Sequence, residues 1–454
     1  MSTLRQFLDQ ASADGLVVDS NEPIGRTKPL ASVLSRESDQ VHLHRVEGYD
    51  GRLVSGLVSS RRLAARALGV EPAALLDSLS RLLAGSGSVR VVDRAPFEEH
   101  VVERPDLGTS LPLQPFYPGD GGPYATAFVV AARSSVTGQN LSFHRMMYLG
   151  KNRFAVRVVR RHLHAILAEG QGKAQVAVFC GVHPAVLLAA AVSAAPDMDE
   201  LRLAANMLGG LDVFEVLPEL FVPAHAEIVL TGSFTGELVD EGPFVDLTGT
   251  YDGVRRQPVF EVDRLWMRSD PIYHAIVPAG PEHKVLMGLP REAALLRAAR
   301  SACPTVEDAV LTAGGSGWLH AVVSVRDSGP GQAVNIGTAV LAAHQSLKRV
   351  VVVDHDIDIL AQQDVEWALA TRVQPDRDIV ILDPARGSSL DPSRRKDGTT
   401  SKWIVDATIP AGADRSEFLR ADAQGDAQGE AQGDVRDNAR GDVSGGLDQT
   451  QRGR

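Results

Sequence analysis

The chain has 454 residues, which at about 150 residues per domain is enough for about three domains. Hydrophobic residues make up 44% and charged residues 23% of it, so a wholly disordered chain is excluded. The formal net charge of −11 argues against non-specific nucleic-acid binding, and we expect no nucleic-acid partner. Only Cys180 and Cys303 are present, which excludes a disulfide framework and a cysteine-rich zinc site. With no secretory signal visible at the N-terminus, we expect a cytoplasmic protein.

One apolar run, residues 176–195, approaches the roughly 20 residues that a membrane-spanning helix needs. Gly181, His183 and Pro184 interrupt it, and glycine and proline are typical of a turn and of a helix start. The run therefore predicts a buried strand, a turn and a helix that has Pro184 in its first turn. We expect no membrane partner.

The first predicted unit, residues 1–120, opens with an amphipathic helix. Leu4, Phe7, Leu8 and Ala11 are spaced at i, i+3, i+4 and i+7, and Gly15 is placed to end the helix. Residues 16–19 then predict a strand, and residues 61–83 predict a helix with a stripe of leucine and alanine. Residues 89–123 are rich in proline and acidic residues, which indicates the crossing into a second domain.

The central unit, residues 121–290, alternates β-rich runs with helices. Helices are expected at residues 162–168 and 199–207, and strands at residues 124–134, 154–159, 175–181, 226–234 and 273–279. A parallel α/β sheet and a barrel with inserted helices both fit this alternation.

Three further segments complete the predicted organisation. Residues 291–304 predict a helical linker, and residues 305–420 show the βαβ-like pattern of a C-terminal α/β domain. The tail, residues 421–454, is built largely from Gly, Asp, Arg and Gln with almost no apolar residues. Such a composition cannot recover the entropy of ordering, so we expect a disordered tail.

Common catalytic motifs are missing from the sequence. It contains no G-x-x-x-x-G-K-[ST], no H-E-x-x-H and no G-x-S-x-G, and no G-x-G-x-x-G follows a strand. Nucleotide-fold cofactor binding and the zinc-protease and serine-hydrolase classes therefore have no support. Polar residues at turns of the central unit remain as candidates.

The segment EGPFVD places two carboxylates, Glu241 and Asp246, around a Gly-Pro turn. It is either a surface turn with solvated acids or a carboxylate pair in which burial raises one pKa and makes a proton donor. Asn140 and Arg145 in NLSFHR are ordinary loop residues when taken alone.

Two helix starts supply further candidates. In RRHLH, His162 and His164 stand two residues apart, which suits neither one helix face nor a common zinc pattern, so at most one would bind a metal. Asp199 and Glu200 begin a helix, where acids ordinarily stabilise the helix dipole.

Taken together, these segments resemble the UbiD family of decarboxylases over residues 124–408. The resemblance rests on the order and spacing of several motifs. They are N-x-x-x-x-R at residues 140–145, the histidine at 162, G-V-x-P-A at 181–185, the helix headed by Glu200, VPAHAEIVLTG at 222–232, EGPF-x-D at 241–246, and VDHDIDI with WALATR at 353–372.

The resemblance implies an α/β fold in three parts: an N-terminal α/β unit, a central flavin-binding split β-barrel and a C-terminal α/β unit. It implies a non-oxidative, potentially reversible decarboxylase that forms an adduct between prenylated FMN and an unsaturated acid. Arg145, Glu241 and Asp246 would be catalytic, with Glu241 protonating the carbon that loses CO₂. A flavin prenyltransferase would supply the cofactor, and self-association into a homodimer or higher homo-oligomer, through the C-terminal unit, is expected.

The cofactor site follows from the same resemblance. Asn140, His162 and Glu200 would hold a divalent ion against the flavin phosphate, and mixed oxygen and nitrogen ligation favours Mn²⁺ or Mg²⁺. Arg161 and Lys402 would also lie near the cofactor, and Arg145 would contact it.

The sequence departs from the family pattern in two places. Val245 stands where the family usually has glycine, and Ala190 and Ala191 replace serines that contact flavin or a monovalent ion, which puts a K⁺ site in doubt. For the substrate, an aliphatic or polyene acid of a biosynthetic pathway is favoured slightly over an aryl or heteroaryl acid. A non-catalytic flavin-binding protein and an FMN reductase are the alternatives.

Overall fold

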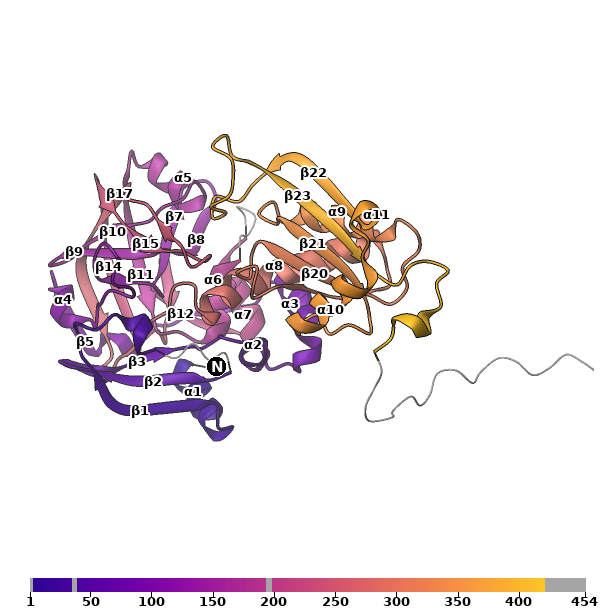
Figure 1. Ribbon diagram of the computed structural model, residues 1–454. Coiled ribbons are helices and arrows are strands. Elements are labelled where there is room, and N and C mark those ends of the chain that lie inside the picture. Colours follow the sequence, from indigo (N-terminus) through magenta and orange to yellow (C-terminus); the bar gives the residue numbers. More distant parts are fainter. Residues whose placement is uncertain (1–2, 35–38, 193–197, 421–454) are drawn as a thin grey trace, which may run out of the picture. The chain divides into compact units, whose positions relative to one another are not determined.

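The computed structural model describes residues 3–34, 39–192 and 198–420 (Figure 1). The tail predicted to be disordered, residues 421–454, lies outside the described residues. Residues Met1–Ala411 form one compact unit. In the described part of the second unit, residues 412–420, Arg415–Phe418 form a short 3₁₀ helix.

The N-terminal part begins with α1 (Leu4–Ala13), whose four predicted apolar residues are all buried. Thr3 caps the helix in a capping box with Gln6. Residues 61–83 form two helices rather than the single one predicted, α2 (Arg61–Leu68) and α3 (Leu75–Leu83). The chain breaks there because Gly69 ends α2 with φ +65° and Pro72 begins a 3₁₀ turn.

The N-terminal sheet has the strand order β1-β2-β3-β18. Its strands are β1 (Val17–Ile24), β2 (Val41–Val46), β3 (Tyr49–Ser55) and β18 (Ile272–His274), so its fourth strand comes from far along the chain. The short helix α4 (Leu107–Ser110) follows the strand β5 (His100–Glu103).

A nine-stranded sheet forms the centre, in the order β6-β9-β10-β17-β14-β11-β7-β8, with β5 paired to β17. Every pairing in it is antiparallel, which decides against the parallel alternative. The strands are β5 (His100–Glu103), β6 (Tyr124–Ala125), β7 (Val129–Ser134), β8 (Gly138–Phe143), β9 (Met146–Gly150), β10 (Arg153–Val156), β11 (Lys173–Cys180), β14 (Ile228–Glu241) and β17 (Arg255–Met267).

The three helices predicted in the central unit are present and pack against strands of this sheet. They are α5 (His162–Glu169), α6 (Pro184–Ala191) and α7 (Glu200–Leu208). The apolar run at residues 176–195 divides into β11 and α6, and no helix among the described residues is long and apolar enough to span a bilayer. A small sheet joins β4 (Val89–Val91) to β12 (Leu211–Leu217) and β13 (Leu220–Pro223). A hairpin of β15 (Phe244–Val245) and β16 (Tyr251–Asp252) follows β14.

The helix α8 (Pro281–Ala302) leads to the C-terminal sheet, so the linker predicted at residues 291–304 is the second half of a longer helix. The sheet has the order β19-β20-β21-β23-β22, with β20, β21 and β23 parallel as the βαβ pattern predicts (Figure 1). Its elements are β19 (Val306–Leu311), β20 (His320–Val325), α9 (Gln332–Ala343), β21 (Arg349–Asp354), α10 (Gln362–Arg372), α11 (Pro375–Asp378), β22 (Ile379–Arg386) and β23 (Thr399–Ala407).

Candidate active site

A buried ion pair between Glu241 and Arg145 is the centre of the candidate site. Glu241 ends β14, and Arg145 lies between β8 and β9. Two nitrogens of Arg145, Nε and Nη2, donate to the two carboxylate oxygens of Glu241 at 2.9 and 3.0 Å. The Tyr124 hydroxyl donates to Glu241 Oε1 at 3.0 Å. The three hydrogen bonds fix the carboxylate plane of a side chain that is fully buried.

The turn after Glu241 is held by close backbone contacts. Gly242 has φ +100°, a conformation that favours glycine, and the Gly242–Pro243 peptide is cis. The amide of Gly121 donates to the Pro243 carbonyl oxygen at 2.7 Å. A Cβ on Gly121 would lie 2.2 Å from the Gly242 carbonyl oxygen, so glycine is required there as well. The segment EGPFVD is therefore a packed part of the site and not a solvated surface turn.

Two further carboxylates complete the surroundings of Arg145. Asp246 Oδ2 lies 3.3 Å from Nη1, and Asp252 Oδ2 lies 3.2 Å from Nη2. The guanidinium carbon stands 4.9 Å from the centre of the Phe244 ring, which covers one side of it. The structure thus brings the predicted Arg145, Glu241 and Asp246 into contact and adds Asp252.

Opposite charges keep the Asp252 carboxyl ionised. Burial opposes this, but a hydrogen bond from Arg255 and the charges of Arg145 and Arg157 hold the pKa of Asp252 below its ordinary value. Burial likewise works against the charge of Arg145, while Glu241, Asp246 and Asp252 raise the pKa of the guanidinium. Arg145 therefore stays a cation throughout any proton movement in the site.

Sequence reasoning missed three members of this site: Tyr124, Asp252 and His283. His283, in the first turn of α8, accepts a hydrogen bond at Nδ1 from the Ala279 amide at 3.1 Å. Desolvation lowers the pKa of His283, which favours the neutral imidazole, and the charges of Asp246 and Arg145 are near enough to act on that pKa. None of the three belongs to a motif in the sequence.

Asn140, His162 and Glu200, the predicted metal ligands, also meet. They come from β8 and from the first residues of α5 and α7. The amide nitrogen of Asn140 lies 2.8 Å from Glu200 Oε1 and 3.2 Å from His162 Nδ1, and the Leu141 amide donates to Glu200 Oε2 at 3.0 Å. His164 is exposed on α5, so of the two histidines it is His162 that joins the set.

The chemistry of this set suits a divalent cation. Glu200 is only 1% exposed, and burial raises the pKa of its carboxyl to about 7 although Leu141 and Asn140 donate to it. A buried carboxylate beside an imidazole and an amide is the mixed donor set that Mn²⁺ and Mg²⁺ accept. The Asn140 nitrogen faces Glu200 where the prediction places the oxygen, and a half-turn of the amide exchanges the two. Asn140 would be needed as a third ligand beside His162 and Glu200, because no group of three or more His, Cys, Asp or Glu side chains suited to a metal occurs within residues 3–34, 39–192 and 198–420.

The remaining predicted residues lie around these two clusters. Arg161 is the N-cap residue of α5, directly before His162. Lys402 is buried on β23 and donates to the Gln345 carbonyl oxygen at 2.7 Å. Val245 is accommodated in β15, where it pairs with Tyr251, and Ala190 is buried in α6.

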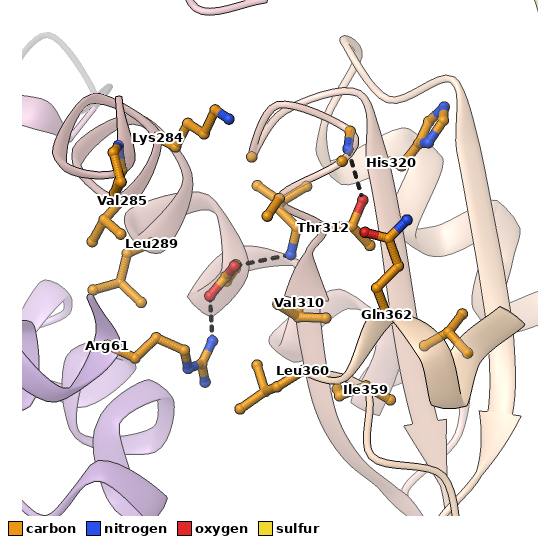
Figure 2. Close-up of a pocket in the computed structure, with 18 of the residues that line it drawn as sticks. Arg61, Lys284, Val285, Leu289, Val310, Thr312, His320, Ile359, Leu360 and Gln362 are labelled. Atoms are coloured by element: carbon orange, nitrogen blue, oxygen red, sulfur yellow. Dashed lines mark hydrogen bonds and ion pairs between the residues drawn. The ribbon is translucent and has the colours of Figure 1, made fainter. Parts of the chain in front are cut away.

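A cavity of about 620 Å³ is lined by α2, α8 and the C-terminal sheet with its loops (Figure 2). At its wall, Arg61 pairs with Glu292, which also accepts from the Leu311 amide at 2.9 Å. The predicted site residues do not line this cavity. It is therefore distinct from both clusters described above.

Comparison with solved structures supports the expected fold. The chain resembles the UbiD-class enzyme HmfF from Pelotomaculum thermopropionicum in complex with FMN, with a TM-score of 0.90 and 36% identity over 93% of this chain and 98% of HmfF. It also resembles an evolved dimeric form of HmfF in complex with prFMN, with a TM-score of 0.86 and 33% identity over 94% of this chain and 99% of that one. The predicted UbiD-like α/β architecture is thereby confirmed.

Comparison with sequences gives the same family. Residues 90–281 match the 3-octaprenyl-4-hydroxybenzoate carboxy-lyase Rift-related domain, and residues 284–407 match the C-terminal domain of that carboxy-lyase. The anhydromevalonate phosphate decarboxylase of Methanothermobacter thermautotrophicus is 42% identical over 414 residues, covering 90% of this chain and 97% of that protein. The chain belongs to the UbiD family and is a carboxy-lyase.

Proposed function

We propose that this carboxy-lyase removes CO₂ from an aliphatic α,β-unsaturated acid with prenylated FMN bound, and that Glu241 supplies the proton to the carbon that loses CO₂. The observation that carries the proposal is the buried Glu241–Arg145 pair, with Asp246 and Asp252 on the same guanidinium. Five similar proteins named anhydromevalonate phosphate decarboxylase, 40 to 42% identical to this chain, make that phosphorylated acid the first substrate to test.

Prenylated FMN, when bound, supplies an electron sink for the electron pair left on carbon as CO₂ departs. Two solved relatives that contain FMN and prFMN support the choice of cofactor. Asn140, His162 and Glu200 would hold Mn²⁺ or Mg²⁺ beside its phosphate, with Arg161 and Lys402 close by. A flavin prenyltransferase would be the partner that supplies the cofactor.

Side chains of the protein hold and transfer the proton. Arg145 fixes Glu241 through two hydrogen bonds, and Tyr124 adds a third, so the carboxyl group keeps one orientation. When Glu241 carries a proton, Asp246 and Asp252 still neutralise Arg145. The proton moves from the Glu241 carboxyl to the substrate carbon, and the resulting carboxylate returns to the ion pair before it takes up a proton from water.

Decarboxylation by the flavin-loaded enzyme tests the proposal. We expect CO₂ release from anhydromevalonate phosphate to exceed that from phenylacrylate and 3,4-dihydroxybenzoate. Release of CO₂ from aryl acids alone would overturn the choice of an aliphatic substrate. Oxidation of NADPH without any CO₂ release would instead support the FMN reductase alternative, and binding of flavin without either reaction the non-catalytic one.

A further inference from the structure

Tyr124 lies directly against the buried acid of the candidate site. Its side chain is fully buried, and its ring centre lies 4.2 Å from the centre of the Phe244 ring, which also covers the guanidinium of Arg145. Tyr124 stands on β6, where it pairs with Met147 of β9. The strand pairing and the contact with Phe244 fix the ring, so the hydroxyl is held against Glu241.

The two carboxylate oxygens of Glu241 have different numbers of hydrogen-bond donors. Oε1 accepts from Arg145 Nε at 2.9 Å and from the Tyr124 hydroxyl at 3.0 Å. Oε2 accepts from Arg145 Nη2 at 3.0 Å, its single donor within the described parts of the chain. Because each carboxylate oxygen has two lone pairs, Oε1 is saturated and the free acceptor position is on Oε2. A proton that Glu241 takes up therefore binds to Oε2.

Tyr124 acts on Glu241 as a donor and not as a base. Burial, the charge of Glu241 and the hydrogen bond between the two groups all raise the pKa of Tyr124 above its ordinary value. The phenol therefore keeps its proton at neutral and moderately alkaline pH. Because a hydrogen bond to an ionised acceptor is stronger than one to a neutral acceptor, the hydroxyl stabilises the carboxylate of Glu241 more than its acid form.

We propose that Tyr124 is a positioning residue, whose hydroxyl occupies Oε1 of Glu241 so that Oε2 carries the transferred proton, and that it sets the upper pH limit of turnover. In the transfer, the O–H bond at Oε2 breaks as the new C–H bond of the product forms, and the carboxylate is left in its ion pair with Arg145. This inference deepens the proposed function and rests on it, because Glu241 is the proton donor there.

Charged and titratable groups from several elements surround the hydrogen bond between Tyr124 and Glu241. They are Arg145, Arg157, Arg255, Asp120, Asp246, Asp252 and His283. All of them stay in place when Tyr124 is replaced by phenylalanine, which lacks only the hydroxyl group. A change in the pH dependence of turnover in that variant therefore reports the loss of one hydrogen bond.

The first experiment compares the pH dependence of kcat in flavin-loaded wild-type enzyme and in Tyr124→Phe. Turnover should fall at high pH, where Glu241 has lost its proton. Without the hydroxyl the carboxyl group keeps its proton to higher pH, so the alkaline limit should move up by about one pH unit, the size expected for one hydrogen bond to a charged group. The same limit in both proteins would overturn the inference.

Replacement of Tyr124 by 3-fluorotyrosine provides a second variant that keeps the hydroxyl. Fluorine makes the phenol a stronger hydrogen-bond donor, so the alkaline limit should move down, opposite to the shift in Tyr124→Phe. A purely structural role of the ring would not give shifts of opposite sign. If Tyr124→Phe does not fold or loses flavin, the fluorinated protein still decides, because an unshifted limit in it would overturn the inference.

Tyr148→Phe is the matched control. The Tyr148 hydroxyl donates to a carboxylate oxygen of Asp106 at 3.0 Å, and this acid is exposed and outside the site. The substitution removes the same kind of hydrogen bond and should keep the wild-type pH limit. In a second control, Asp120→Asn is combined with Tyr124→Phe, and the shift caused by Tyr124→Phe should remain. Its disappearance would show that Asp120 is the group that titrates, which overturns the inference.

Fluorine NMR tests the contact without turnover. With 3-fluorotyrosine at position 124, the fluorine resonance should change with pH as Glu241 gains and loses its proton, and Glu241→Gln should abolish this change. A resonance that keeps its pH dependence in Glu241→Gln would overturn the inference. If the pH dependence does require Glu241 but no acid is decarboxylated, the proposed function is wrong and the hydrogen bond to Oε1 stands. Decarboxylation with an unshifted pH limit overturns the inference and leaves the decarboxylase.

Discussion

Glu241 receives three hydrogen bonds in the site, two from Arg145 and one from Tyr124. Glutamine has nearly the same shape and keeps an acceptor oxygen, but it carries no acidic proton. We therefore expect Glu241→Gln to lower turnover by about 10²- to 10⁴-fold, the usual contribution of general acid catalysis. Turnover and the incorporation of solvent deuterium at the carbon that loses CO₂ measure the effect.

Glu237→Gln is the matched control, because Glu237 lies on the same strand and is exposed. It should keep wild-type turnover and wild-type deuterium incorporation. If Glu241→Gln retains both while flavin is bound, another group delivers the proton and the role proposed for Glu241 is wrong.

Which residues of the site could be predicted depends on whether they stand in a motif. Arg145, Glu241 and Asp246 belong to short segments with a recognisable order, and the structure brings them together. Asp252 and Tyr124 lie in ordinary turn and strand sequence and reach the site only because β16 pairs with β15 and β6 pairs with β9.

Three secondary-structure elements position the residues predicted to bind a metal. His162 and Glu200 are the first residues of α5 and α7, and Asn140 lies within β8. Sequence periodicity predicted both helix starts within one residue. It could not predict that the central sheet is antiparallel, because most of β7 and the second half of β11 are buried on both faces and so lack the alternation that marks an antiparallel strand with one solvated face.

We expect His162→Ala to lose bound metal and flavin during purification. Removal of the imidazole leaves Glu200 and Asn140 as the remaining ligands, and the cofactor phosphate would be less well neutralised. Metal content by mass spectrometry and flavin absorbance measure the result. His164→Ala, at an exposed position on the same helix, should keep both. Full metal and flavin content in His162→Ala would count against the assignment of His162.

His183 makes the start of α6 sensitive to pH. Its Nδ1 accepts a hydrogen bond from the Ala185 amide at 3.1 Å, and burial lowers the pKa of His183 to about 4. The unfolded chain, with a histidine pKa near 6.5, therefore binds a proton before the folded protein does. Above about pH 6.5 the His183 imidazole is neutral in both the folded and the unfolded chain and does not lower the free energy of unfolding. As the pH falls from about 6.5 to about 4, only the unfolded chain takes up the proton, so the free energy of unfolding decreases.

Asparagine at this position can cap the helix and does not titrate. From pH 7 to pH 4, we expect the free energy of unfolding of the wild-type protein to fall by about 3 kcal/mol more than that of His183→Asn. Urea unfolding at the two pH values measures the difference, and any constant loss from the missing contact with Phe7 cancels. Equal losses in both proteins would show that His183 is not the group that titrates.

At the scale of the whole molecule, the parts of the chain are interleaved. β18 (Ile272–His274) completes the N-terminal sheet, while β5 and β4 extend from the N-terminal region into pairings with β17 and β12. The three parts were predicted from the alternation of strands and helices and from the family resemblance, and the alternation carries no information about which distant strands pair. The boundary set at residue 290 falls inside α8 for the same reason.

Self-association through the C-terminal unit stays a prediction, and the edge of its sheet supports it. Within the described part of the chain, β22 is the last strand in the order β19-β20-β21-β23-β22, so one of its sides has no paired strand there. Ile381 on this strand is 68% exposed, and Leu382 beside it is exposed as well. An apolar edge strand of this kind is typical of a surface that another chain covers.

We propose that β22 contributes to contact between copies of the chain. Flavin-loaded wild-type protein should be a dimer or higher oligomer at micromolar concentration by light scattering. Ile381→Lys should shift it toward the monomer, because a charge buried between two copies has no partner there. Val136→Lys is the control. Val136 is 84% exposed and lies between β7 and β8 in the central part of the chain, so this substitution adds the same charge outside the C-terminal sheet and should leave the oligomer intact. A monomeric wild-type protein would contradict self-association, and an oligomer that tolerates Ile381→Lys would place the contact on another surface.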